Sequence, residues 1–322
     1  MKALILSEIK QRVRGKRWWI LLSLWVTVLA AVTFLARLGA QAQLRSFGGF
    51  GEDVGGIPLG PTMFGSLMLF TLSLICLVVP SLTSTSVNSE RDRGTFAVLQ
   101  ATLLKPQEIF LAKFASGLLV ALAFLAASIP LTLWTMAEGG VGLGRASVVY
   151  VVLILMCAVL LSVGLATSAF LRRPALSAVM SYAVVFLLTI GTLILFGVSV
   201  ITAPTETVRV QEEFGDFTTQ ERVIGWRWVI LAPNPFVVLA DAAPRSNSRF
   251  VPDPLEGIRD SVRQARRPAG APMSFGESER EPPALWPAGL SIELALALAA
   301  GYLTVGRLRI PARRLAPGQR VA

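Results

Sequence analysis

The sequence contains no histidine and only two cysteines, and charged residues make up just 16% of its 322 residues. Without histidine, and without paired carboxylates in its apolar segments, the chain lacks the clustered groups that a membrane-embedded enzyme needs. Cys76 and Cys157 each lie inside an apolar segment, where we expect free packing residues rather than a disulfide framework. No metal-ligand spacing is found, so the sequence predicts neither an enzyme nor a metal protein.

A phosphate-binding loop is also missing from the sequence. The pattern Gly-x-x-x-x-Gly-Lys-Ser/Thr does not occur, and the five lysines lie outside glycine-rich connections between a strand and a helix. The glycines at 142–144 fit a short turn better than a nucleotide site. We therefore expect this chain to bind no cofactor and to have no energy source of its own.

Apolar residues are abundant instead, at 53% of the chain. Six segments reach the roughly 20 residues that are needed to cross a membrane. Since lipid offers no hydrogen bonds to the backbone, each segment must be a helix. The sequence thus predicts an all-α integral membrane protein whose six transmembrane helices cover residues 18–36, 63–83, 109–135, 147–170, 175–202 and 285–305.

The distribution of lysine and arginine predicts the orientation. With a cytoplasmic N-terminus, the cytoplasmic pieces carry 17 basic residues, whereas the two short outer loops carry three, Arg37, Arg45 and Arg145. This asymmetry satisfies the positive-inside rule with both termini in the cytoplasm. It also explains the net charge of +10 by membrane orientation and anionic lipid headgroups, without a nucleic-acid partner.

The expected organisation has five parts. These are a cytoplasmic amphipathic helix at 1–17, five spans within 18–202, an extracytoplasmic segment at 203–284, the last span at 285–305 and a basic tail at 306–322. The apolar residues of the first helix share one face, so it should lie in the headgroup plane. It could serve as a plain anchor or as a lever that touches a cytoplasmic partner.

The segment 203–284 contains a stretch, 223–243, that is apolar enough to resemble a seventh span. Arg227 and the break at Pro233–Pro235 argue against a crossing, so we predict an interfacial or re-entrant piece. Leu255, Ile258 and Val262 have helical spacing and predict a short helix farther along. We favour a cap over the helices, although a lid that gates a substrate remains an alternative.

A polar bridge at 88–107 connects the second and third spans and must lie at a membrane surface. Gly94 suits a helix end and Thr95 a new N-cap. Pro106 and Glu108 both suit the first turn of the third span. The bridge should therefore contain one short helix between two long ones.

The short helix has an apolar face made of Phe96, Leu99 and Leu103. This face could lie on lipid or enter the groove of a partner, whose motion would then be transmitted to the spans. The charged run at 90–93 beside it favours a partner protein.

At these residues the chain resembles the membrane subunits of type-2 ABC transporters, or ABC exporter permeases. That family carries Glu-Arg-x-x-Gly-Thr after its second span, then a leucine-containing run, a proline, and a lysine at the start of the third span. The matching residues here are Glu90, Arg91, Gly94, Thr95, Leu99, Pro106 and Lys113. The amphipathic first helix, the six spans and the larger outer segment agree with the same family.

The resemblance implies that the bridge is a coupling helix that docks on a separate ATPase subunit, which would bind ATP and Mg. Two permeases, either two copies or a copy and a paralogue, would assemble with two ATPases in a bacterial cytoplasmic membrane and contact its lipids. A hydrophobic or amphipathic substrate, such as a drug, an antibiotic or a lipid, would be exported. The expected ATPase-coupling residues are Glu90, Arg91, Gly94, Thr95, Phe96, Leu99 and Leu103.

Glu293 is the one acidic residue within an apolar span, at a depth of about 10 Å. Because an ionisable group in the membrane costs a few kcal/mol, it should face other helices or a wet cavity. It could belong to the substrate pathway, or it could snorkel or pair with an outer arginine. A proton-coupled secondary transporter is the alternative function, although one acid and no internal repeat give it little support.

Overall fold

The computed structural model describes residues 15–47, 57–88, 105–212, 215–246, 252–266 and 282–308. Most of the predicted amphipathic helix at 1–17 and most of the basic tail lie outside these ranges. The description below concerns the described residues alone.

Six helices in these ranges are long and apolar enough to cross a membrane. They are α2 (Lys16–Phe47), α3 (Gly60–Thr83), α6 (Pro106–Ala137), α7 (Leu143–Phe170), the run α8–η3–α9 (Pro174–Ile201) and α12 (Trp286–Leu308). Each contains or nearly coincides with one predicted segment, so the predicted all-α membrane architecture is confirmed. The first helix continues well past its expected end at residue 36, because the polar residues that follow still favour a helix.

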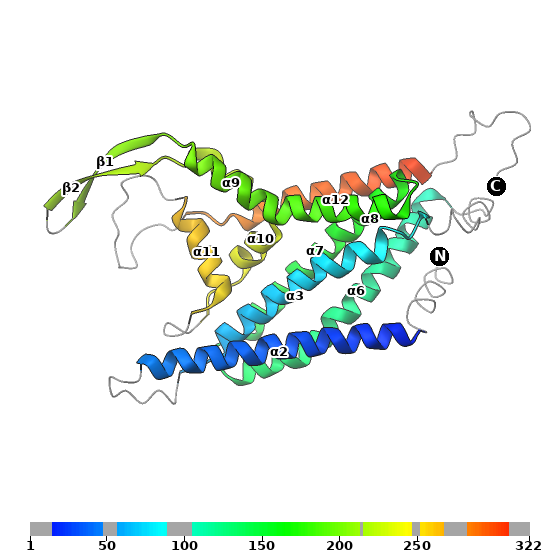
Figure 1. Ribbon diagram of the computed structural model, residues 1–322, viewed down its shortest axis with the longest axis horizontal. Coiled ribbons are helices and arrows are strands. Elements are labelled where there is room, and N and C mark those ends of the chain that lie inside the picture. The colour runs from blue at the N-terminus through cyan, green and yellow to red at the C-terminus, as the bar shows by residue number, and fades with distance from the viewer. Residues whose placement is uncertain are drawn as a thin grey trace, which may run out of the picture.

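The first residue of α2 and the last residue of α12 lie at the same end of the bundle (Figure 1). An even number of crossings requires this arrangement. We call this end the base. The opposite end, where the described residues of 203–285 gather, is called the cap end. The end of α3, the start of α6 and the short turn between α7 and α8 all lie at the base (Figure 1).

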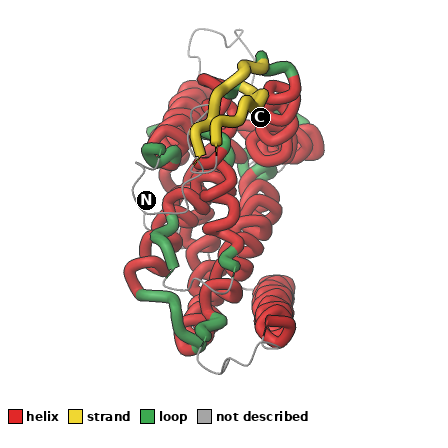
Figure 2. Tube along the Cα trace, turned by 90° about the vertical axis from the view of Figure 1, so that its left-hand side faces the viewer, coloured by secondary structure: helices red, strands yellow, loops and turns green. Residues whose placement is uncertain are grey.

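The helices α3 and α7 form the centre of the bundle, and most of their apolar side chains are buried. Cys76 and Cys157 lie among these side chains as free thiols, as packing residues would. α2 lies at the margin of the bundle (Figures 1 and 2), where Trp18 and Trp25 pack on the ring of Phe124 at centroid distances of 5.1 and 4.9 Å. Its exposed apolar face suits contact with lipid.

The fifth span changes its helical geometry in the middle. A π-helical turn, η3 (Leu187–Gly191), separates α8 (Pro174–Phe186) from α9 (Thr192–Ile201). Such turns leave backbone groups displaced from the regular pattern. Asn234 binds to the chain at this turn, where its Nδ2 donates hydrogen bonds of 2.8 Å to the carbonyl of Thr189 and to Oγ1 of Thr192.

The outer segment is more ordered than its sequence predicted. It contains the antiparallel strands β1 (Thr205–Glu212) and β2 (Gly215–Arg222), a 3₁₀ helix η4 (Gly225–Leu231), and the helices α10 (Pro235–Ala242) and α11 (Pro254–Gln264). The hairpin projects away from the bundle at the cap end (Figure 1). Our reading of the sequence missed it, because polar and charged residues dominate both strands and few apolar residues alternate along them.

The apolar stretch 223–243 does not cross the membrane as one helix. It breaks between η4 and α10, where Asn234 accepts hydrogen bonds from the backbone N–H groups of Phe236 and Val237 and thereby caps α10. Val238 and Leu239 are fully buried in the main core. α10 is therefore a short helix that packs into the bundle, while its predicted interfacial or re-entrant position in the membrane stays a prediction. The predicted helix with Leu255 on its buried face is α11.

Buried charges fasten the cap end. Arg145, in the first turn of α7, forms ion pairs with Asp253 and Glu256 of the outer segment, and its guanidinium lies over the ring of Phe64 at 5.7 Å. Asp253 also caps α11 by accepting a hydrogen bond from the N–H of Leu255. Burial raises the pKa of Asp253, while the charge of Arg145 opposes this rise. The segment is thus fixed on the bundle by a charged contact that lipid or water barely reaches.

A second charged contact joins the outer segment to the last span. Asp241, at the end of α10, accepts a hydrogen bond of 2.8 Å from Nε of Arg263. Its other carboxylate oxygen accepts from the N–H groups of Leu285 and Trp286, at 2.5 and 2.9 Å. These bonds satisfy backbone donors at the start of α12. One carboxylate therefore joins α10, α11 and α12.

Candidate functional site

The candidate site lies at the base, where the bridge leaves α3 and enters α6. The predicted ATPase-coupling residues all lie outside the described residues; they are Glu90, Arg91, Gly94, Thr95, Phe96, Leu99 and Leu103. Their roles stay predictions. The structure does describe both attachment points of the bridge, Asn88 and Lys105.

The attachment to α6 has the geometry that its sequence predicts. α6 begins at Pro106, and Lys105 before it has an extended backbone conformation. Oε2 of Glu108 accepts a hydrogen bond of 2.8 Å from the N–H of Lys105. Proline at the first helical position and an acidic residue in the first turn both stabilise a helix start. The end of the bridge is thus continuous with a well-capped span.

The attachment to α3 is a hydrogen-bonded turn at residues 84–87. The N–H groups of Val87 and Asn88 donate to Oγ of Ser168, at 3.0 and 3.3 Å. Oγ of Ser177 donates to the carbonyl of Ser84 at 2.6 Å. Since Ser168 belongs to the last turn of α7 and Ser177 to the first turn of α8, two neighbouring spans hold the start of the bridge.

Lys113 is a buried cation beneath this turn. Its side chain comes from the second turn of α6, only 3% of the residue is exposed, and Nζ donates a hydrogen bond of 3.3 Å to the carbonyl of Ser86. A lysine is rarely buried without such a partner. The lysine that carried part of the family resemblance therefore joins the end of α3 to the start of α6.

The spans approach closely at the same place. A Cβ atom added to Gly164 of α7 would lie 2.0 Å from Oγ1 of Thr83, and one added to Gly117 of α6 would lie 2.9 Å from Cδ2 of Leu161. Gly164 is therefore needed for the close contact of α3 and α7 at the base, whereas a Cβ atom at Gly117 would crowd only the flexible end of Leu161. A push on the bridge would reach three spans that cannot easily slide past one another.

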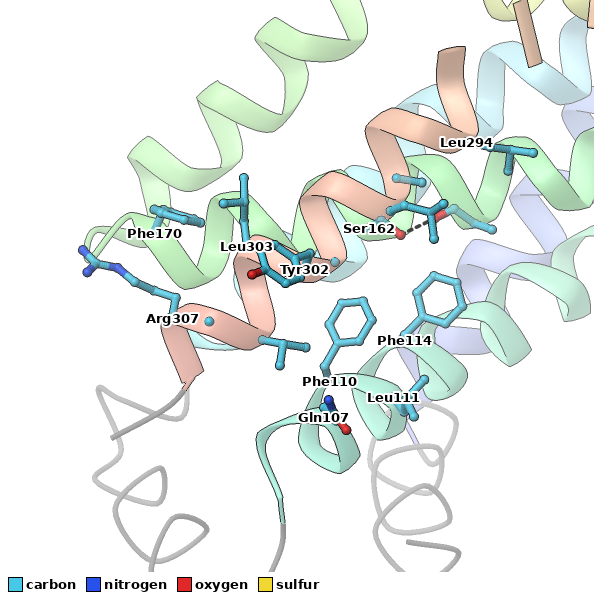
Figure 3. Close-up of a pocket in the computed structure, with 16 residues that line it drawn as sticks. Gln107, Phe110, Leu111, Phe114, Ser162, Phe170, Leu294, Tyr302, Leu303 and Arg307 are labelled. Carbon is cyan, nitrogen blue, oxygen red and sulfur yellow. Dashed lines mark hydrogen bonds between the residues drawn. The ribbon is translucent and has the colours of Figure 1, made fainter. Parts of the chain in front are cut away.

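A groove of about 730 Å³ opens at the base between α6, α7 and α12 (Figure 3). Small residues make room for it, namely Ala158 and Ser162 of α7 and Ala297 and Gly301 of α12. Aromatic and aliphatic side chains from α6 and α12 form its walls. Our sequence reading did not predict this groove, because its small residues come from two spans that are far apart in the chain.

Glu293 lies inside the bundle rather than in the groove. It has no exposed surface, and neither carboxylate oxygen has a hydrogen-bond partner within the described residues. The next residue, Leu294, lines the groove instead. The sequence predicted that Glu293 faces either other helices or a wet cavity, and its position in the structure matches the first of these. The structure gives no described arginine as its partner.

Taken together, the spans and their arrangement define a multi-pass membrane protein whose base is built to hold a polar bridge. A family model described as "ABC-2 family transporter protein" matches residues 2–223, which is well over half of the chain. The chain belongs to this family and is a membrane component of transport. Members of the family normally work with an ATPase subunit. No curated protein was found to match the chain.

Proposed function

We propose that the chain is the permease subunit of an ATP-driven exporter and that a separate ATPase docks on the bridge at 88–107. The observation that carries this proposal is the construction of the base. Ser168 accepts a hydrogen bond from the start of the bridge, and Ser177 and Lys113 donate to it, so that it is tied to α6, α7 and α8. A partner that moved the bridge would therefore move several spans as one body.

The proposed orientation places the base in the cytoplasm. Arg172 and Arg173 form the short connection between α7 and α8 at this end, and the sequence places further basic residues in the bridge and at both termini. A cysteine at Arg173 should then react with an impermeant thiol reagent only after the membrane is opened. A cysteine at Leu143, which is exposed at the cap end, should react in intact cells. The reverse pattern would contradict the orientation.

The proposed substrate is hydrophobic or amphipathic, of the drug, antibiotic or lipid-like kind. Three long spans expose apolar side chains along much of their length, and Glu293 is the one acid buried within a described span without a partner. Such a membrane region offers few groups that could replace the hydration shell of an ion. The ATP and Mg would be bound by the partner ATPase.

The coupling hypothesis is tested by copurification of the ATPase. Replacing Phe96 and Leu99 by alanine should lower the amount of ATPase that copurifies by about tenfold, because apolar anchors dominate such interfaces. Leu143→Ala is the matched control, since Leu143 is an exposed leucine at the opposite end. Transport by the purified chain without any companion subunit would contradict the proposal.

The buried, unpartnered carboxyl of Glu293 keeps proton-coupled transport as a second candidate. A secondary transporter of this kind should respond to a proton gradient without ATP and should stop working in Glu293→Gln. If transport by the permease–ATPase complex needs ATP and survives this replacement, the second candidate is excluded.

A further inference from the structure

We propose that the groove between α6 and α12 binds a membrane phospholipid with an anionic headgroup, its phosphate at Arg307 and an acyl chain along α12. Lipid binding in the groove does not depend on whether an ATPase drives the chain. The shape of the groove, its single charged side chain and its length along α12 support it.

The groove is apolar along most of its length and polar at one end. Phe110 and Phe114 of α6 point toward α12 along it (Figure 3), and Leu298 and Gly301 of α12 also line it. Gly301 lets the ring of Phe110 lie close to α12, because a Cβ atom there would be 3.2 Å from the ring. The result is a wall of aromatic carbon that an acyl chain can contact and that water would hydrate poorly.

The polar end carries one charge, which is positive. Arg307 and Gln107 both line the groove at this end, and the guanidinium of Arg307 extends toward Phe170, 5.4 Å from its ring centroid (Figure 3). No carboxylate lines the groove, and within the described ranges no acidic side chain pairs with Arg307. A phosphate is a group that a planar guanidinium binds well, through two parallel hydrogen bonds.

The length of the groove matches one leaflet. It extends along α12 from Arg307 to Leu294, which is about 20 Å at 1.5 Å per residue. Half of a bilayer with its headgroup region measures about 20–22 Å. Arg307 lies at the last turn of α12, where the span reaches the membrane surface, so a phosphate there would stand at headgroup height.

A bound lipid would complete the packing of α12. This helix packs extensively on α7, whereas the groove separates much of it from α6. Leu298 and Tyr302, which line the groove, are 75% and 79% exposed, so both are open to contact with lipid. An acyl chain between them and Phe110 would join α12 to the span that carries the end of the bridge.

The test uses the full-length chain in detergent, titrated with phosphatidylglycerol or phosphatidylcholine and analysed by native mass spectrometry. The wild type should bind one phosphatidylglycerol in preference to phosphatidylcholine. Arg307→Gln should lower the phosphatidylglycerol affinity by about tenfold and remove the preference. Since Arg307 is exposed, its replacement leaves the core intact. Arg173→Gln is the matched control, because it removes an exposed charge at the same end but outside the groove.

A second pair of variants tests the apolar part. Ala297→Phe fills the groove and should lower the binding of both lipids, whereas Ala299→Phe, on the same helix but outside the groove, should not. Equal losses in Arg307→Gln and Arg173→Gln would overturn the proposal, as would unchanged binding in Ala297→Phe. The proposal would also be overturned if two chains of the Leu298→Cys variant formed a disulfide efficiently through residue 298, because a second copy of the chain would then cover the groove.

Discussion

The two ends of the bundle are held by different kinds of interaction. At the cap end, buried ions such as Arg145 and Asp253 join the outer segment to the spans. At the base, neutral hydrogen bonds to Ser168 and Ser177 hold the bridge, with Lys113 as the one ion among the contacts described there. A buried ion pair is costly to break, whereas each neutral bond contributes about 1 kcal/mol. The comparison indicates a cap end fixed by a few strong charged contacts and a base held by several weaker ones.

The largest expected effect comes from Arg145→Met. It would leave Asp253 and Glu256 in a buried site without their cation, at a cost of about 3–5 kcal/mol in the free energy of unfolding. The control is Arg37→Met, which breaks a more exposed ion pair with Glu138 at the same end. Its expected cost is below about 1 kcal/mol. Thermal unfolding in detergent measures both, and equal losses would show that the buried pair is not a special anchor.

The next effect concerns the close approach of helices at the base. Gly164→Ala puts a methyl group 2.0 Å from Oγ1 of Thr83, so α3 and α7 must separate, at a cost of about 1–3 kcal/mol. Gly144→Ala in the same helix is the control, because nothing lies within 4 Å of its added Cβ atom. That control should be neutral or slightly stabilising, since alanine favours a helix more than glycine does. If both variants unfold alike, the contact at Thr83 is looser than the structure indicates.

The stability that Asp253 gives to the cap end should also depend on pH. Burial raises the pKa of Asp253, so the folded state holds this proton to a higher pH than the unfolded state, in which the pKa is about 3.9. The stability that this gives is present below about pH 4 and is lost as the pH rises through the folded value. Arg145 opposes the rise, so Arg145→Met should raise the folded pKa further.

We expect acid to restore part of the stability that Arg145→Met loses. As the pH falls from neutral toward the unfolded pKa of about 3.9, the free energy of unfolding of Arg145→Met should rise relative to that of the wild type, by up to about 1.4 kcal/mol per unit of difference between the two folded pKa values. The measurement is the difference in thermal unfolding between the two proteins across this range. A constant difference would mean that Asp253 does not titrate there and that another group explains the loss.

The sequence allowed the spans to be predicted and left much of the cap end unpredicted. Apolar length places a helix in lipid almost regardless of its neighbours, so the spans agreed with the structure, and Pro106 and Glu108 located the start of α6. The pairing of Arg145 with Asp253 joins residues 108 positions apart, which no local pattern encodes. The groove likewise depends on which faces of α7 and α12 meet. The contacts of Lys113 were also unpredicted, although the family resemblance had singled it out.

The smallest expected effect, that of Ser168→Ala, tests the other side of the comparison. It removes the acceptor for the N–H groups of Val87 and Asn88, and should cost about 1 kcal/mol in stability. Ser147→Ala is the control, because Ser147 bonds only within its own helix on an exposed face at the cap end. If the base transmits motion from the bridge, Ser168→Ala should lower ATP-driven transport more than Ser147→Ala at matched stability, while the copurified ATPase stays constant. Equal transport in the two variants would mean that this serine merely stabilises the turn, and coupling would have to depend on Lys113 or on the close contact at Thr83.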